Sequence, residues 1–212
     1  TFTIDLHWMR EFSQHYPREI GLPFNCNARV ETLSREMLSV LKEAGCDMLF
    51  VGVESGSEWL RKEVLQRKMT NEQIVTAFAT AHEMGFKTFA YNMVGLPFET
   101  PQMAEETIAL NQKINASKTQ ITTFYPYPGT ELYRICQEQG YLTPKNKDSY
   151  FYEGSVLNLP TMSSEQIVVY HRKMWDLKLK RELENRRFLR PFFTALKAVL
   201  DERRTLRLGN MV

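Results

Sequence analysis

The side chains best suited to chemistry follow directly after an apolar run. Residues 48–53 read MLFVGV, and Glu54, Ser55 and Ser57 come next, with Gly56 between the two serines. The apolar run is typical of a strand buried on both faces of a parallel sheet, and ligands bind such sheets at the carboxyl ends of their strands. We therefore interpret the carboxylate and the hydroxyls as candidate ligand-binding groups. Serine at this place also caps a following helix, and that alternative stays open.

Cysteine and histidine do not form a metal-ligand pattern in this sequence. Cys26, Cys46 and Cys136 have spacings that fit neither a disulfide framework nor a metal-ligand pair, so we interpret them as reduced and structural. The four histidines are scattered, and none stands at ligand spacing from a cysteine or a carboxylate. We predict no metal ligand and assign no catalytic residue within this chain.

Alternating strand and helix patterns predict the elements that position the candidate groups. Strands are expected at residues 24–30, 47–55, 87–94 and 119–125, after the end of an earlier strand at 1–4. Helices are expected at residues 6–16, 33–44, 57–66, 70–84, 101–114 and 131–139. Because parallel strands joined by helices use right-handed crossovers, this order predicts an α/β fold with a mainly parallel sheet, either a barrel or an open sheet.

Capping residues mark several of these helix starts. Asp5 or Thr3 is expected to cap the first helix, and Thr70 forms a capping box with Gln73. Thr100 stands before a proline at the first helical position, which is another helix-start signal.

The C-terminal part of the sequence predicts a loop at 141–162 and helices at 163–185 and 191–202. The loop contains three adjacent aromatic residues, Tyr150, Phe151 and Tyr152. These side chains would line a hydrophobic pocket or belong to the core, and the sequence leaves both alternatives open.

Composition and charge are those of an ordinary globular protein, with 43% hydrophobic and 12% aromatic residues. Since no window approaches the ~20 apolar residues of a membrane span and no secretion signal is visible, we expect a cytoplasmic protein without a span. Residues 171–212 contain 12 Lys and Arg against 5 Asp and Glu. Such a basic tail is typical of a solvated helix face, or of a surface for nucleic acid, an anionic membrane or an acidic partner.

Four stretches, in order, carry a family resemblance: GVESGS, EVLQRKMT, NMVGLPFET and YPYPGTELY. Together they resemble the later part of the catalytic core of radical S-adenosylmethionine (SAM) enzymes, over roughly residues 1–142. The likeness is greatest to members with an upstream cobalamin-binding domain, which include the anaerobic magnesium-protoporphyrin monomethyl ester cyclases and many cobalamin-dependent methyltransferases. The resemblance implies an incomplete (β/α)6 partial barrel at 1–142, followed by a loop and C-terminal helical extension at 143–212 without chemistry of its own.

The resemblance also implies roles for individual residues around SAM. Glu54 matches the acidic residue that binds the ribose hydroxyls, with Ser55 assisting. Arg67 matches an arginine that binds the SAM carboxylate, which a guanidinium does through two parallel hydrogen bonds. A solvated cation at a helix end is the alternative for Arg67.

The remaining candidates line the adenine side and the rim. The adenine would be received by Met93, Val94 and Gly95 and enclosed by Tyr125 and Pro126. A strand-to-helix turn would also require glycine at 95 without any ligand. Substrate or rim contacts are expected from Asn27, Arg29 and, more weakly, Asn92. An ion pair between Arg29 and Glu54 that holds the barrel rim is the alternative.

One expected feature of the family does not occur in this sequence. The family holds a 4Fe-4S cluster with a Cys-x3-Cys-x2-Cys loop, and that spacing is absent here. We therefore expect the chain to be the later part of a longer enzyme that reductively cleaves SAM, to be inactive alone, and to lack the ligands for the cluster and for cobalamin. A flavodoxin or ferredoxin as electron donor and an unnamed small-molecule substrate are implied. A barrel without its first strand should also self-associate.

Two other functions compete with this interpretation. A barrel that has lost its cluster would be a binding or scaffold module, with the basic tail docking a partner. A conventional α/β-barrel hydrolase or aldolase would need convergent Asp, Lys or His at several strand ends, where this sequence offers Arg29 and Glu54.

Overall fold

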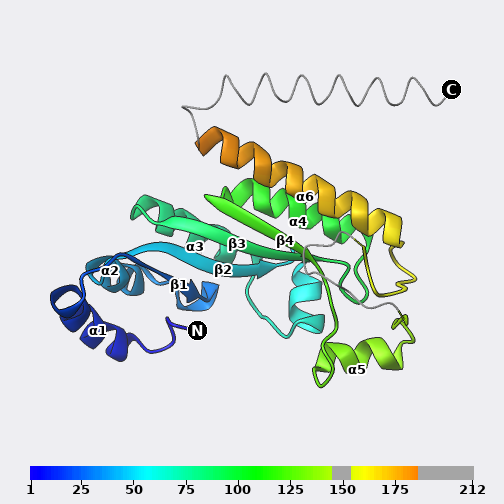
Figure 1. Cartoon of the computed structure of the whole chain (residues 1–212), viewed down its shortest axis with the longest axis horizontal. Coiled ribbons are helices and arrows are strands. Elements are labelled where there is room, and N and C mark those ends of the chain that lie inside the picture. The colour runs from blue at the N-terminus through cyan, green and yellow to red at the C-terminus, as the bar shows by residue number, and fades with distance from the viewer. Residues whose placement is uncertain (145–153, 186–212) are drawn as a thin grey trace.

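A four-stranded parallel sheet forms the centre of the computed structural model, which describes residues 1–144 and 154–185 (Figure 1). Its strands pair in sequence order and are β1 (Phe24–Ala28), β2 (Cys46–Glu54), β3 (Lys87–Val94) and β4 (Lys118–Thr123). All three pairings are parallel, which confirms the parallel sheet predicted from the alternating pattern.

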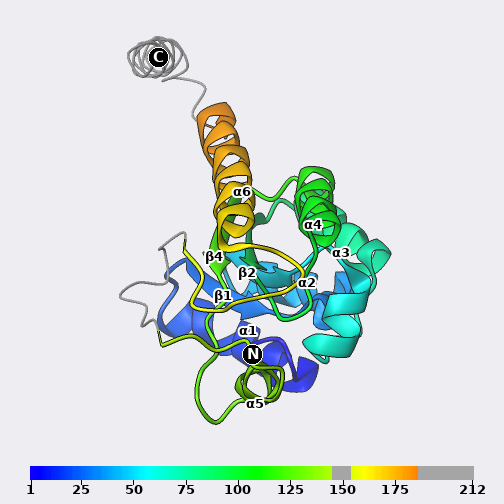
Figure 2. The ribbon, with the colours of Figure 1, turned by 90° about the vertical axis from the view of Figure 1, so that its right-hand side faces the viewer.

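Helices precede, connect and follow the strands. They are α1 (Leu6–Glu19), α2 (Arg35–Glu43), α3 (Asn71–Glu83), α4 (Pro101–Ile114), α5 (Glu131–Glu138) and α6 (Ser164–Asn185). A 3-10 turn (Val30–Thr32) follows β1, and a short π-helix (Leu60–Val64) follows β2. Both views show α3, α4 and α6 on the same side of the strands (Figures 1 and 2).

Alternation along the strands decides which side chains meet the helices. Leu49, Val51 and Val53 of β2 are buried and pack in a core cluster with residues of α2 and α3. The residues between them, Phe50 and Gly52, are half-buried and lie on the opposite face. Because side chains alternate across a strand, the opposite face collects the half-exposed groups of all four strands.

A second core cluster joins the C-terminal helix to the sheet. Ile167 and Met174 of α6 belong to the same buried cluster as Val94 of β3 and Ile121 of β4. The predicted division into residues 1–142 and 143–212 stays a prediction. Both the aromatic cluster at 150–152 and the helix expected at 191–202 lie outside the described residues.

The predicted helix caps are confirmed. The Asp5 carboxylate accepts hydrogen bonds from the N–H groups of His7 and Trp8. Thr70 and Gln73 form the expected capping box. The Thr100 hydroxyl accepts from the N–H of Met103, with proline at the first position of α4. Each cap is a local interaction, which is why sequence patterns predict it well.

One predicted element is wrong, and another is shorter than predicted. Residues 1–4 form a turn rather than the end of a strand, with one backbone bond from Phe2 N to Asn27 O at 3.1 Å. Thr3 is buried, and its hydroxyl lies 2.5 Å from that of Thr32. A side-chain hydrogen bond therefore holds this segment, in place of the backbone hydrogen bonds of a paired strand. The helix predicted at 57–66 is shorter and contains the π-helix, in which Leu65 N donates to Leu60 O.

Across residues 1–144 and 154–185, the helices fall short of the length and apolar character needed to cross a membrane.

Candidate functional site

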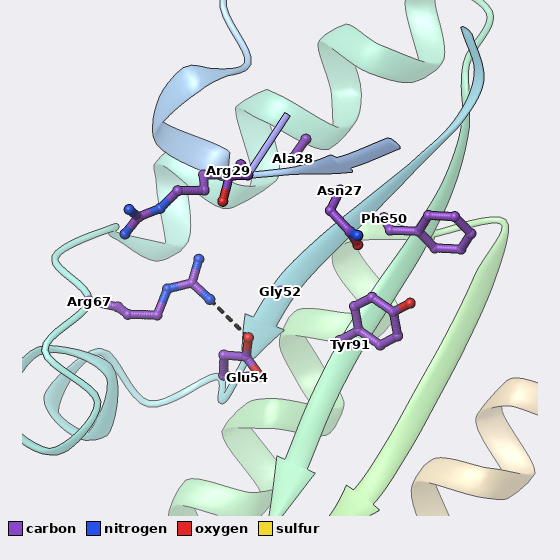
Figure 3. Close-up of a pocket in the computed structure, with 9 residues that line it drawn as sticks. Asn27, Ala28, Arg29, Phe50, Gly52, Glu54, Arg67 and Tyr91 are labelled. Atoms are coloured by element: carbon purple, nitrogen blue, oxygen red, sulfur yellow. Dashed lines mark hydrogen bonds and ion pairs between the residues drawn. The ribbon is translucent and has the colours of Figure 1, made fainter. Parts of the chain in front are cut away.

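An open cleft of about 280 Å³ lies at the carboxyl ends of β1 and β2 (Figure 3). It is lined by Thr1, Asn27, Ala28, Arg29, Phe50, Gly52, Glu54, Arg67 and Tyr91. These residues come from β1, β2, β3 and the loop after the π-helix, so segments distant in sequence meet at one edge of the sheet. The location agrees with the strand-end site expected from the sequence.

The cleft contains a partly buried ion pair. Arg67 Nη1 donates to Glu54 Oε1 at 2.9 Å, and the two side chains are 18% and 21% exposed. Burial raises the pKa of the Glu54 carboxyl, while the charge and hydrogen bond of Arg67 act in the opposite direction. The arrangement brings together two of the residues that the family resemblance implies for SAM binding.

Glycine at position 52 makes room for this pair. A Cβ there would lie 2.2 Å from Glu54 Oε1 and 2.7 Å from Arg67 Nη1. The ion pair can therefore lie across the surface of β2 only because position 52 has no side chain. Glu54 itself ends the strand at a register shift, with a left-handed φ of 69°. Such conformations are uncommon outside glycine and concentrate at functional sites.

Aromatic rings form the wall of the cleft on the other side of Gly52 (Figure 3). The Phe50 and Tyr91 ring centroids are 6.0 Å apart, and Phe89 lies 5.2 Å from Phe50 and 5.0 Å from Tyr91. The site thus has a charged end and an apolar wall, an arrangement suited to a ligand with both kinds of surface.

The rim residues Asn27 and Arg29 line the same cleft from β1 and its end. Arg29 Nη2 lies 3.7 Å from Glu31 Oε1, and its side chain is about half exposed. Glu54 pairs with Arg67, so the structure does not form the alternative rim pair between Arg29 and Glu54. Arg29 is therefore turned toward solvent at the mouth of the site.

Ser55 and Asn92, two of the predicted residues, lie away from the cleft. Ser55 is fully buried; its hydroxyl lies 3.3 Å from that of Thr107 on α4 and accepts from the N–H of Ser57. Asn92 is buried on the helix side of β3, where its amide exchanges hydrogen bonds with the Asn111 amide. These positions support the capping alternative for the serines and give no support to a rim role for Asn92.

The adenine-side candidates lie at the end of β3 and in the segments that follow β3 and β4. Met93 is half-buried, Val94 is buried in the core, and Gly95 has a φ of 81°. A Cβ at Gly95 would approach Ile167 of α6 to 3.2 Å, so α6 lies directly against this turn. Beyond β4, Pro126 is buried and Tyr125 is half-buried. These five residues lie outside the set that lines the cleft, and their adenine role stays a prediction.

Sequence reasoning missed two buried charged residues. Glu99 is fully buried and accepts from the N–H groups of Gly95 at 2.5 Å and Leu96 at 3.1 Å. Arg61, on the π-helix, is also fully buried. A glutamate four residues after the glycine of a turn was a usable signal for Glu99. For Arg61 the sequence gives no such signal, because it is one of several charged residues between 58 and 68 and its residue type does not distinguish it from the exposed ones.

Comparison with known protein families gives a match at residues 6–110 to the radical SAM superfamily. The chain belongs to this superfamily. Its members are enzymes, and the family implies SAM and a 4Fe-4S cluster as cofactors.

Relatives of two reaction types match the chain. An uncharacterized methyltransferase of Pyrococcus horikoshii is 28% identical over 176 residues, covering 82% of this chain and 38% of the relative. The anaerobic magnesium-protoporphyrin IX monomethyl ester cyclase of Rubrivivax gelatinosus is 24% identical over 208 residues, covering 92% of this chain and 37% of the relative. The chain therefore spans little more than a third of the length of these radical SAM relatives.

Solved structures agree on the fold. Coproporphyrinogen III oxidase from Escherichia coli, a radical SAM enzyme, superimposes with a TM-score of 0.61 at 16% identity, covering 82% of this chain and 38% of the oxidase. The radical SAM methyltransferase TsrM from Kitasatospora setae, solved with tryptophan and a SAM analogue, gives 0.58 at 19% identity, covering 79% and 34%. The likeness supports the incomplete partial barrel with a C-terminal helix.

The described residues fit the two family cofactors differently. Cys26 and Cys46 are buried on the helix side of β1 and β2, with their sulfurs 3.8 Å apart, and Cys136 is buried in α5. Burial raises the pKa of the Cys136 thiol to about 11, whereas iron–sulfur clusters require thiolates. Within the described part of the chain, no group of three His, Cys, Asp or Glu side chains could hold a metal ion. The cleft, by contrast, offers groups that match parts of SAM.

Proposed function

We propose that this chain forms the part of a radical SAM catalytic core that binds SAM, with the cleft between β1, β2 and β3 as the binding site. The proposal rests on the Glu54–Arg67 pair lying over Gly52 at the carboxyl end of β2. A carboxylate and a guanidinium there face one space, which suits a ligand that carries both hydroxyl groups and a carboxylate. Membership of the superfamily supports SAM as that ligand.

Each side of the cleft then has a role. Because Glu54 Oε1 bonds Arg67, Oε2 is the oxygen that accepts a ribose hydroxyl. Arg67 binds the SAM carboxylate through N–H groups that do not point at Glu54. The half-exposed Arg29 and the exposed Asn27 face the substrate side. The end of β3 and the segments that follow β3 and β4 receive the adenine through Met93, Val94, Gly95, Tyr125 and Pro126.

The chain's own residues hold and orient SAM and supply no redox chemistry. A 4Fe-4S cluster would supply the electron for the reductive cleavage of SAM, and its thiolate ligands would come from outside this chain. The reaction is of the cyclase and oxidoreductase type or of the cobalamin-dependent methyltransferase type, since relatives of both kinds match. We further propose a cytoplasmic enzyme that receives electrons from a flavodoxin or ferredoxin, acts on a small molecule, and is inactive as this chain alone.

Glu54→Ala and Arg67→Ala test the proposal in the cluster-loaded enzyme that contains this chain. A lost hydrogen bond to a charged group costs about 1.5–3 kcal/mol, so SAM affinity should fall by roughly 10- to 100-fold in each variant. Equilibrium dialysis with SAM measures the affinity, and thermal denaturation measures folding. The free energy of unfolding should change much less than the free energy of SAM binding, because both side chains are partly exposed.

Arg35→Ala is the matched control, because Arg35 forms an exposed ion pair with Glu83 on the helix side. It should leave SAM affinity unchanged. Unchanged affinity in both cleft variants would remove these assignments, and absence of SAM binding by the parent enzyme would favour the scaffold module instead.

A further inference from the structure

Arg61 is a fully buried arginine, which is rare for a side chain that carries a permanent charge. Its guanidinium donates three hydrogen bonds, one from each nitrogen. Nη1 donates to Ser55 O, Nε donates to Met69 O at 3.3 Å, and Nη2 donates to Asn71 Oδ1 at 2.7 Å. The nearest carboxylate, Glu58, lies 3.9 Å away and is half exposed, so backbone and amide oxygens are its main partners.

Two of the acceptors, Ser55 O and Met69 O, belong to the segment that joins β2 to α3, and the third, Asn71 Oδ1, is on the first residue of α3. Ser55 immediately follows Glu54, and Met69 lies two residues after Arg67. The guanidinium therefore connects the start of the segment, beside one cleft residue, to its end, beside the other. A further bond runs from Arg67 N to the backbone oxygen of Arg61 at 2.7 Å.

Asn71 completes this connection. Its side-chain Nδ2 donates to Gly56 O at 3.0 Å, while its Oδ1 accepts from Arg61. The two ends of the segment are thus bridged directly through Arg61 and again through Asn71. The π-helix contributes as well, because a single π-turn changes the direction of the following side chains and such turns are frequent at functional sites.

Arginine is the residue type that this position requires. A planar guanidinium reaches three acceptors in fixed directions, whereas the ammonium of lysine is a point charge on a flexible stem. Stability alone does not favour such a residue, because a buried charge loses hydration and well-packed apolar residues are often as stabilising. The connection to both cleft residues offers a functional reason for a buried cation.

We propose that Arg61 is a positioning residue that fixes the distance and direction between Glu54 and Arg67 for SAM binding. The proposal rests on the proposed function of the cleft. Arg61 touches no ligand itself. It acts by holding Ser55 and Met69, so that the carboxylate and the guanidinium of the cleft are already paired over Gly52 before SAM arrives.

The first experiment measures SAM affinity of the cluster-loaded enzyme with Arg61→Met, Arg67→Ala and the double variant. If Arg61 acts through Arg67, Arg61→Met should lower affinity about tenfold on its own but cause little further loss when it is added to Arg67→Ala, because directly coupled residues are not additive. The proposal would be overturned if the loss of SAM affinity in the double variant equalled the product of the losses in the two single variants, because a merely structural role of Arg61 predicts that the two substitutions act independently. Unchanged affinity in Arg61→Met would overturn it as well.

The second experiment needs no SAM and separates this inference from the proposed function. Hydrogen exchange of the backbone amides of 54–71 in the unliganded enzyme should be faster in Arg61→Met than in the control Arg35→Met, most of all at Arg67 N–H. Equal exchange overturns the positioning role whatever the ligand is. If exchange rises but Arg67→Ala leaves SAM affinity unchanged, the proposed function fails while the positioning role stands.

Milder variants keep the test decisive if Arg61→Met does not fold. Asn71→Ala removes one acceptor of Arg61 and the hydrogen bond to Gly56 O. Arg61→Lys keeps the positive charge but loses the planar guanidinium that reaches three acceptors. Both should accelerate exchange at 54–71 and weaken SAM binding. Full retention of protection and affinity in both variants would overturn the proposal.

Discussion

Glu99 is a carboxyl group buried beneath the turn that follows β3. Its Oε2 accepts two backbone N–H bonds, while Oε1 has no hydrogen-bond partner among the described residues. Burial raises the pKa of this carboxyl from 4.5 to about 7, and the two backbone bonds oppose the rise only in part. A group with a raised native pKa binds its proton more tightly in the folded than in the unfolded protein.

Glu99→Gln should therefore change how stability depends on pH. The stability that protonated Glu99 contributes is complete below pH 4.5 and is lost as pH rises to about 7, which corresponds to roughly 3 kcal/mol. Relative to the parent, Glu99→Gln should gain up to that amount between pH 4.5 and 7.5, measured by urea unfolding at several pH values. The control Glu72→Gln replaces an exposed glutamate of α3 and should show no comparable gain. A pH-independent difference for Glu99→Gln would contradict the raised pKa.

At single positions, the family motifs marked Glu54 and Arg67, and these two side chains lie together in the structure. Their role in SAM binding stays a prediction. Arg61 was missed because charged side chains on a short helix normally face solvent, and only the packed structure reveals the buried one. Asn92 was misplaced because strand alternation turns it to the helix side, and a residue type alone does not specify the face.

At the level of elements, the turn after β2 is attached to α4. Gly56 N donates to Thr107 Oγ1 at 2.8 Å, and a Cβ on Gly56 would lie 2.2 Å from the carbonyl oxygen of Glu106. The backbone of the turn thus packs directly on the helix backbone, which only glycine permits. This contact fixes the position of the end of β2, and with it Glu54, relative to α4.

Thr107→Val should loosen this attachment. The variant keeps the shape of the side chain but removes the acceptor for the buried Gly56 N–H, and an unsatisfied buried donor costs about 1–3 kcal/mol. Urea unfolding should show a loss in that range. Thr76→Val, at an exposed position of α3, should change stability by no more than about 0.5 kcal/mol. Equal effects of the two variants would contradict the role of this hydrogen bond.

Elements were predictable to the extent that local interactions define them. Thr70 and Thr100 mark their helices through bonds within the first turn, and both helices begin where expected. The segment at 1–4 was mistaken for a strand because its apolar residues fit one, while the contact that fixes it, Thr3 with Thr32, joins residues far apart in sequence. The π-helix was not predicted because its pattern of residues is that of an ordinary charged helix.

For the molecule as a whole, the two ends of the sheet are β1 and β4. The backbone oxygen of Asn27 accepts from Phe2 N and so points away from β2. Backbone groups alternate along a strand, so those of Asn25 point the same way. Exposed strand edges of this kind are sites where a second chain can pair.

The 212-residue chain should therefore self-associate, which sedimentation velocity measures over a range of concentrations. Asn25→Pro removes an outward N–H without removing a bond to β2, and should shift the population toward monomer. Asn25→Ala keeps the N–H and should behave like the parent. A monomeric parent at all concentrations would contradict association through the β1 edge.

Strand order also bears on how the protein is synthesised. Each strand pairs with the one that precedes it in sequence, from β1 to β4. As the chain leaves the ribosome, every new strand and helix can therefore join an edge that already exists, without waiting for a distant partner. Helix α6 is the last element that the structure describes, and it packs on Val94 of β3 and Ile121 of β4. Translation from the N-terminus and assembly of the sheet thus proceed in the same direction, and α6 is made only after both of the strands on which it packs.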